Sequence, residues 1–272
     1  LKKQQSLIAM LGGLMNASVG AAPVIGSYIT LYFHWQGNFI TLLILGLATF
    51  VMTILFIPTH KLPEHKETLS LHGYIPLFQS MPLMLLIVHI VFMFVPYWIF
   101  VGMSPLLYME DLRVSLSHFG YYQGALAFVY GIGSILFSLI VTRYDQKKML
   151  YISNQIFIAG FISVALVTFL DSANPLFITL AFLPFILGQI IPSTILYPLS
   201  LSFMPQAKGR ISAVIQGGRL IFSALCLQLA GYFYEGSFRN IGIMIMGFIA
   251  LTIITLFFVI KNRELMEFSR EQ

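Results

Sequence analysis

Long runs of apolar residues alternate with short polar gaps along the whole chain. The eight runs cover residues 7–32, 38–58, 80–103, 116–142, 149–170, 175–203, 211–233 and 241–260. A helix rises about 1.5 Å per residue, so each run can cross the roughly 30 Å hydrocarbon core of a bilayer. No run shows the strict alternation of a barrel strand, and in lipid the backbone must pair its own polar groups. The pattern predicts an all-α polytopic membrane protein with eight transmembrane helices.

Composition supports the same class. The chain is 58% hydrophobic and 9% charged, whereas about a quarter of the residues in soluble domains are charged. The net charge of +5 would suit nucleic acid only if the cations gathered on one soluble face. They lie in the gaps between apolar runs instead, so nucleic acid is not an expected partner.

Lysine and arginine are concentrated in every second gap. One side holds Lys2, Lys3, Lys61, Lys66, Arg143, Lys147, Lys148, Lys208, Arg210, Lys261, Arg263 and Arg270. The other side holds only Arg113 and Arg239, and Arg219 lies inside a run. Cytoplasmic loops of membrane proteins carry the excess of Lys and Arg. We therefore expect a multi-pass protein of a bacterial-type inner membrane with both termini in the cytoplasm.

The longest polar gap divides the chain into unequal parts. We expect 1–58 to be two helices of an N-terminal bundle, 59–79 a cytoplasmic linker, 80–260 a six-helix bundle and 261–272 a cytoplasmic tail. Many transporters are built from six-helix halves. Because the chain also begins with Leu1 and not with Met, we expect it to be truncated at its N-terminus, which the coding DNA upstream would show.

The first run carries small residues at helical spacing. Gly20, Pro23 and Gly26 lie within one stretch, and the aromatic residues Trp35 and Phe39 follow at the entrance of the next run. Small residues let a second helix approach closely, and a proline permits a bend at that contact. By physics alone the stretch predicts a tight helix pair with a bend.

This stretch and the two aromatic residues resemble the fifth-helix antiporter motif of the major facilitator superfamily, and drug/proton antiporters of the Bcr/CflA type are especially similar. The usual Gly-Pro of the family is Ala22-Pro23 here, and its Gly-Gly is Gly26-Ser27. The resemblance implies that the first run packs against the eleventh helix and takes part in gating.

A second similarity lies in the gap after the fourth run. Arg143, Asp145, Lys147 and Lys148 resemble the second copy of a cytoplasmic loop motif of the superfamily. An acidic residue there can hydrogen-bond a helix N-terminus, although a plain cluster of cytoplasmic cations explains the two lysines equally well. Further similarities near the end of the third run and between the sixth and seventh runs match the eight runs to helices five to twelve.

Few polar side chains lie deep in the runs, so these few are candidates for a substrate or proton pathway. We select His89, Tyr97, Trp98, Gln189 and Arg219. The alternative for His89 is a histidine bonded to a neighbouring helix, and the alternative for Arg219 is an arginine that snorkels or is bonded to carbonyls. Ordinary packing is the alternative for the rings. No Asp or Glu lies deep in any run, so proton coupling is implied only by the resemblance.

These observations favour a secondary active transporter that exports amphiphilic small molecules by proton antiport with alternating access. One alternative is a truncated remnant that no longer transports, and another is a carrier of a metabolite or organic anion, which Arg219 would favour. No His/Asp/Glu or Ser/His constellation at depth and no phosphate-binding loop are present, so we expect no enzyme, cofactor or metal. The expected partners are a small amphiphilic substrate, protons and the lipid bilayer.

Overall fold

The structure is a computed structural model that describes residues 2–57 and 71–271. Its elements are α1 (Lys2–Phe56), the 3-10 turn η1 (Leu71–Tyr74), α2 (Ile75–Gln79), α3 (Met81–Ser104), the π-helical turn η2 (Pro105–Asp111), α4 (Leu116–Ile140), the 3-10 turn η3 (Val141–Arg143), α5 (Gln146–Phe169), α6 (Pro175–Phe203), the 3-10 turn η4 (Pro205–Ala207), α7 (Lys208–Tyr232), α8 (Phe238–Lys261) and α9 (Arg263–Glu271). Seven of the helices described are long and apolar enough to cross a membrane. The predicted all-α polytopic class is confirmed.

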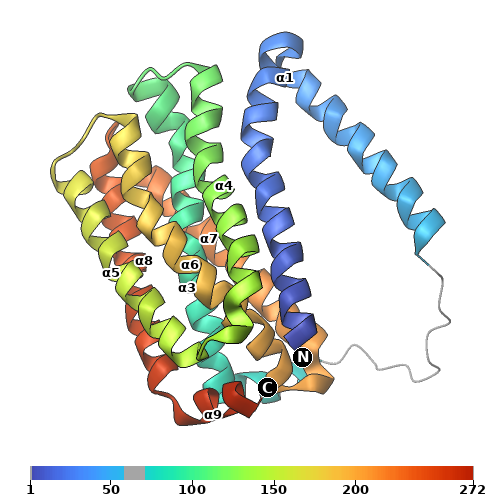
Figure 1. The fold of residues 1–272 in the computed structure, drawn as a ribbon. Coiled ribbons are helices and arrows are strands. Elements are labelled where there is room, and N and C mark those ends of the chain that lie inside the picture. Colours follow the sequence, from blue (N-terminus) through green and yellow to red (C-terminus); the bar gives the residue numbers. More distant parts are fainter. Residues whose placement is uncertain (1, 58–70, 272) are drawn as a thin grey trace.

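Helix α1 contains both of the first two predicted spans, joined by a kink. The kink lies at His34, whose φ of 59° and ψ of −175° are non-helical. Across it, Asn38 Nδ2 donates a hydrogen bond to Thr30 Oγ1 at 2.6 Å. The first arm runs beside α4 and the second leads away from the bundle (Figure 1). The predicted count of eight therefore holds only if the two arms are counted as separate spans.

The ends of the later helices follow local capping chemistry. Asp145 Oδ1 accepts a hydrogen bond from the Lys148 amide at 2.9 Å and caps α5. Asn174 accepts one from the Leu176 amide at 2.9 Å, and Pro175 follows it at the start of α6. Side chains that accept from the first free amides of a helix fix where it begins. These capped starts lie within a few residues of the predicted runs.

Three boundaries differ from the predictions. The third run continues past Ser104 as η2, because a turn of π-helix carries the helix on to Asp111. The predicted tail contains the helix α9, in which Leu265 and Met266 are buried. The predicted linker contains η1 and α2 in its second half, and its part at 59–70 lies outside the described residues. All three segments are too short or too polar to stand out as apolar runs.

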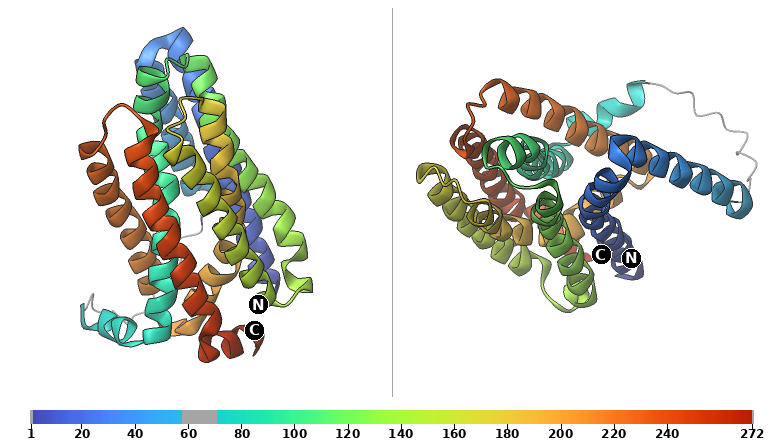
Figure 2. Two further views of the ribbon diagram at one scale, coloured as in Figure 1. Left: turned by 90° about the vertical axis from the view of Figure 1, so that its left-hand side faces the viewer. Right: turned by 90° about the horizontal axis from the view of Figure 1, so that it is seen from above.

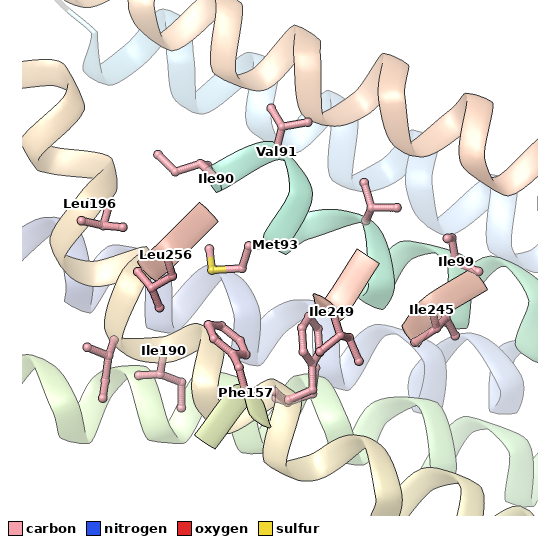
Figure 3. Packing of buried hydrophobic residues seen from close by; sticks show 14 of the residues in the cluster. Ile90, Val91, Met93, Ile99, Phe157, Ile190, Leu196, Ile245, Ile249 and Leu256 are labelled. Atoms are coloured by element: carbon pink, nitrogen blue, oxygen red, sulfur yellow. The ribbon is translucent and has the colours of Figure 1, made fainter. Parts of the chain in front are cut away.

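The bundle of α3 to α8 is held by close packing of aliphatic and aromatic side chains. Helix α3 packs on α8, α7 and α6, and α5 packs on α6 and α8, as the views in Figure 2 show. In the core, Ile90 and Met93 of α3 lie among Phe157 of α5, Ile190 of α6 and Ile249 of α8 (Figure 3). Lipid is as apolar as these side chains, so the packing contacts themselves hold the helices together.

Two glycines allow the close contact between α5 and α6. A Cβ at Gly160 would lie 2.8 Å from the Phe185 backbone nitrogen, and a Cβ at Gly188 would lie 2.8 Å from Cδ1 of Phe157. In the same contact, Ser153 Oγ of α5 donates a hydrogen bond to the Gly188 carbonyl of α6 at 2.8 Å. Both helices can approach so closely because each lacks a side chain where the other is bulky.

The two ends of the described chain lie at the same end of the bundle (Figure 1). The exposed Arg143, Lys147 and Lys148 belong to the turn between α4 and α5, and α9 packs against α5 and α8. An even number of crossings is needed to bring both termini to one side. This placement requires the two arms of α1 to be counted as separate crossings.

Candidate functional site

Arg219 lies near the middle of α7 and is stacked on an aromatic ring of α3. Its Cζ is 3.5 Å from the centroid of the Phe94 ring, and its Nη1 donates to Gln216 Oε1 at 3.2 Å. Its Nε is buried and, among the residues the structure describes, has no hydrogen-bond partner. A guanidinium carries five N–H donors, so this cation is only partly satisfied by the protein.

Two tyrosines from other helices complete the surroundings of Arg219. Tyr130 of α4 and Tyr197 of α6 are its electrostatic neighbours. Tyr130 also interacts with Ser193 of α6, and the Tyr197 hydroxyl lies 3.1 Å from Ser212 Oγ of α7. Helices α3, α4, α6 and α7 thus converge here. We use the name polar cluster for the set Phe94, Tyr130, Tyr197, Gln216 and Arg219.

Aromatic side chains extend the polar cluster along α3. The rings of Phe94 and Trp98 have centroids 5.4 Å apart, and those of Tyr97 and Trp98 are 6.3 Å apart. Trp98 is 37% exposed, whereas Tyr97 is half-buried. The structure therefore brings two of the predicted pathway residues, Trp98 and Arg219, to the same ring.

Gln189 connects two helices and does not extend into the polar cluster. The side chain is buried in α6, and its Nε2 donates to the carbonyl oxygen of Met93 in α3. An amide whose donor is already bonded to a backbone carbonyl is held in place. In this arrangement Gln189 positions α6 on α3 directly beside Phe94.

His89 lies on a different face of α3. It is fully buried, and its Nδ1 lies 3.0 Å from Thr255 Oγ1 of α8. The single proton of the Thr255 hydroxyl can go to the Leu251 carbonyl at 2.8 Å, and with this proton placement the oxygen accepts from Nδ1–H of the histidine. Nε2 has no partner within the described part of the chain. His89 and Phe94 are five residues apart, roughly 140° around the helix, so His89 is not part of the polar cluster.

The small residues of α1 make their closest contact with α4. A Cβ at Gly120 of α4 would lie 2.5 Å from Ser27 Oγ and 2.9 Å from the Pro23 carbonyl oxygen. Among the described residues, Gly26 has only Asn38 of the same helix near its Cβ position, at 3.6 Å. Gly20 lies one turn before Pro23 in α1. The glycine that allows the close approach is therefore on the partner helix.

The neighbour of α1 corrects one expectation. The resemblance implied packing against the eleventh helix, which is α7 in the predicted register, but α1 packs principally on α4 and then on α6. The hydroxyls of Tyr28 and Tyr121 lie 2.7 Å apart across the α1–α4 contact. Gly120 gives α4 the flat surface against which the backbone of α1 at Pro23 packs.

The sequence profile of the Major Facilitator Superfamily matches residues 1–225 and 85–271 of the chain. This chain belongs to the Major Facilitator Superfamily. Proteins of this superfamily are transporters built from membrane helices, and the prediction that the chain is not an enzyme is confirmed by this membership.

Curated relatives carry names that refer to drug resistance. The chain is 21% identical to the chloramphenicol resistance protein CraA of Acinetobacter baumannii over 85% of its own length and 57% of the relative. It is 24% identical to the multidrug resistance protein MdtL of Shewanella oneidensis over 96% and 66%. It is 26% identical to a bicyclomycin resistance protein homolog of Haemophilus influenzae over 81% and 54%. The chain thus spans between about half and two thirds of the length of these relatives.

The residues of the predicted loop motif lie in the turn between α4 and α5 and in the first turn of α5. Arg143 ends η3, Asp145 caps α5, and the side chains of Lys147 and Lys148 are exposed. The acidic residue stabilises the helix start through its hydrogen bond with the Lys148 amide. The cations lie at the end of the bundle that also holds the chain ends (Figure 1).

At the opposite end, a contact between η2 and the α7–α8 loop was not predicted. The Tyr234 hydroxyl donates to Asp111 Oδ2, and Gly236 beside it adopts a left-handed φ of 81°. Burial, and after it the hydrogen bond to Asp111, raises the pKa of the Tyr234 hydroxyl above its ordinary value. The contact ties α7 to the end of the α3 span.

Sequence reasoning missed Tyr130, Ser193 and Gln216 of the arginine surroundings. Gln216 could have been found, because residues three apart on a helix lie on the same face. Tyr130 and Ser193 offered no such signal, since hydroxyl side chains also occur at ordinary packing positions of membrane helices. Only the arrangement of the helices brings Tyr130 near Arg219 and Ser193 near Tyr130.

Proposed function

We propose that this chain forms part of a secondary active transporter that moves small amphiphilic compounds out of the cytoplasm by alternating access, in exchange for protons. The observation that carries the proposal is the polar cluster, in which groups from four helices meet around the half-buried Arg219. Transporter substrate sites lie near the bilayer midplane between helices. The names of the relatives support drug-like compounds as the substrates.

The orientation belongs to the same proposal. The two chain ends and the turn between α4 and α5 lie at one end of the bundle (Figure 1). In and just after this turn lie the cations Arg143, Lys147 and Lys148, and cytoplasmic ends of membrane proteins are rich in such cations. We therefore place this end in the cytoplasm of a bacterial-type cell, with α3–α8 as the C-terminal bundle and the two arms of α1 as part of the N-terminal one.

Proton exchange is supported by the resemblance to drug/proton antiporters. No Asp or Glu occurs within α1 or in any helix from α3 to α8, so the carboxylate that such exchange usually employs is not supplied by these helices. His89 is the buried imidazole in these spans, and its contact with Thr255 serves the α3–α8 interface.

Accumulation of a drug in living cells tests this function. A bacterial strain without its own major efflux pumps would carry the natural gene, and accumulation of chloramphenicol and of a fluorescent amphiphilic dye would be measured. We expect lower accumulation than with an empty vector, and a protonophore should remove the difference. Equal accumulation at verified membrane expression would contradict efflux, and higher accumulation would indicate an uptake carrier.

A further inference from the structure

Arg219 carries a positive charge in the middle of a membrane span without a balancing carboxylate. Its electrostatic neighbours in the described structure are the hydroxyls of Tyr130 and Tyr197, and its hydrogen bond goes to the neutral Gln216. Asp and Glu are absent from the sequences of α1 and α3 to α8. A charge at such depth is costly and faces protein or a water-filled cavity, so a further anionic partner would stabilise it.

The N–H donors along the edge of the guanidinium remain for such an anionic partner. The Phe94 ring lies 3.5 Å from Cζ, ring centroid to atom, and holds the group from that side, and Gln216 takes one donor of Nη1. Nε points to no acceptor among the described residues. The planar fork of an arginine matches the two oxygens of a carboxylate or phosphate.

The surroundings also fit an apolar body attached to an acidic group. Trp98 lies 5.4 Å from Phe94, ring to ring, and is 37% exposed, so an aromatic surface continues from the guanidinium toward open space. Tyr130 and Tyr197 add hydroxyl groups near the cation. Binding sites for small molecules combine such apolar walls with a few placed polar groups.

We propose that the polar cluster binds the acidic group of an amphiphilic organic anion. Two oxygens of a carboxylate, sulfonate or phosphate pair with the edge of the Arg219 guanidinium, and the apolar part of the compound lies along Phe94 and Trp98. In a site of low dielectric constant, such a charge pair is far stronger than in water. That this anion is also transported rests on the proposed function, whereas its binding does not.

Fluorescence of Trp98 can measure this binding directly. The chain has two tryptophans, so Trp35→Phe leaves Trp98 as the single reporter, beside the proposed ligand. The full chain in lipid nanodiscs would be titrated with 4-phenylbutyrate, its methyl ester and 4-phenylbutylamine, which share one apolar body. Hydrogen bonds to a charged group lead us to expect about tenfold tighter binding of the carboxylate than of the ester, and the weakest binding for the amine.

Substitutions at Arg219 test whether this residue causes the tighter binding of the carboxylate. Arg219→Gln should remove the advantage of the carboxylate over the ester. Arg219→Lys should keep only part of that advantage, because the ammonium lacks the fork and the ring contact. Arg239→Gln is the matched control, since it removes the same charge from an exposed position at the start of α8, and it should leave all three affinities unchanged.

Each outcome decides the proposal. Equal or tighter binding of the ester or amine by the unsubstituted Arg219 chain overturns it, and this comparison does not depend on how any Arg219 variant folds. An unchanged preference in a folded Arg219→Gln variant overturns it as well. Carboxylate binding without export in the cell assay would refute the proposed transport and leave the binding site intact. Export that is indifferent to Arg219 would refute the site and leave the transport intact.

Discussion

On the side of the bundle where α3 meets α8 and α5 meets α6, buried polar groups bond to a neighbouring helix. His89 bonds to Thr255, and Ser153 bonds to the Gly188 carbonyl. On the side where α7 packs on α3, Arg219 is held on Phe94 with its Nε unpaired in the described structure. We call these the packing side and the polar side. Polar residues thus serve helix association on the first and leave donors available on the second.

The same contrast holds for the glycines. On the packing side, a Cβ at Gly160 would meet the backbone of Phe185, which belongs to the same bundle. At the α1–α4 contact, a Cβ at Gly120 would meet the backbone of Pro23 in α1. The first contact joins neighbours within the bundle, and the second joins the bundle to α1, which under the proposed alternating access would move relative to it.

The largest expected effect is the loss of transport caused by the substitution Arg219→Gln. Loss of the charged fork removes the strongest hydrogen bonds available to a substrate, so the rate of export should fall at least tenfold if about 1.4 kcal/mol of binding is lost. Initial rates of dye export from everted membrane vesicles measure this. Arg239→Gln should export normally, and an Arg219→Gln variant that exported as fast as this control would remove the distinction between the two sides.

The next effect is on stability, at Gly160→Leu. The new side chain would begin 2.8 Å from the backbone nitrogen of Phe185, and overpacking of this kind costs about 1–3 kcal/mol. Thermal melting of the purified protein in detergent should show a lower midpoint. Gly247→Leu is the control, because a Cβ at Gly247 has nothing within 4 Å. Equal midpoints for the two variants would show that the packing side is not tightly packed.

A smaller effect, and one on transport, is expected for Gly120→Ala. The methyl group would lie 2.9 Å from the Pro23 carbonyl oxygen, and α1 must shift on α4 to accept it. We expect the export rate to fall severalfold while the melting midpoint of the bundle stays close to that of Gly247→Ala. A loss of stability as large as that of Gly160→Leu would place the α1–α4 contact among the packing contacts.

The smallest effect is expected at His89→Leu. Hydrogen bonds between membrane helices average about 0.6 kcal/mol, and Thr255 keeps its own backbone acceptors. The melting midpoint should therefore change little, and the dependence of export on external pH should remain that of the parent. A flattened pH profile in the folded variant would restore His89 as a proton-carrying residue of the pathway.

The positions of the helices could be predicted from the sequence, but the contacts between helices could not. The lengths of the apolar runs are set by the thickness of the bilayer, so the run 175–203 coincides with α6. The charge of Arg219 inside a run was enough to select it as a candidate. The partner of α1, which the resemblance gave as the eleventh helix, was predicted wrongly. The small residues themselves show that a contact exists without showing which helix makes it.

Residues whose role depends on the arrangement of the helices could not be predicted. Gly120, which lets α1 approach α4, and Thr255, which binds His89, look like ordinary small residues of an apolar run. Helix α9 is short and polar, and only its packing on α5 and α8 distinguishes it from a disordered tail. Such contacts join residues far apart in the chain, so no local pattern specifies them.

A photoaffinity probe tests most directly whether the polar side holds the ligand. A benzoate that carries a trifluoromethyl-diazirine group would be irradiated with the full chain in nanodiscs, and the labelled residues would be identified by peptide mass spectrometry. We expect labelling of α3 around Phe94 and Trp98 and of α7 around Arg219, removed by excess 4-phenylbutyrate. Competed labelling confined to α5 and α8, on the packing side, would contradict the assignment.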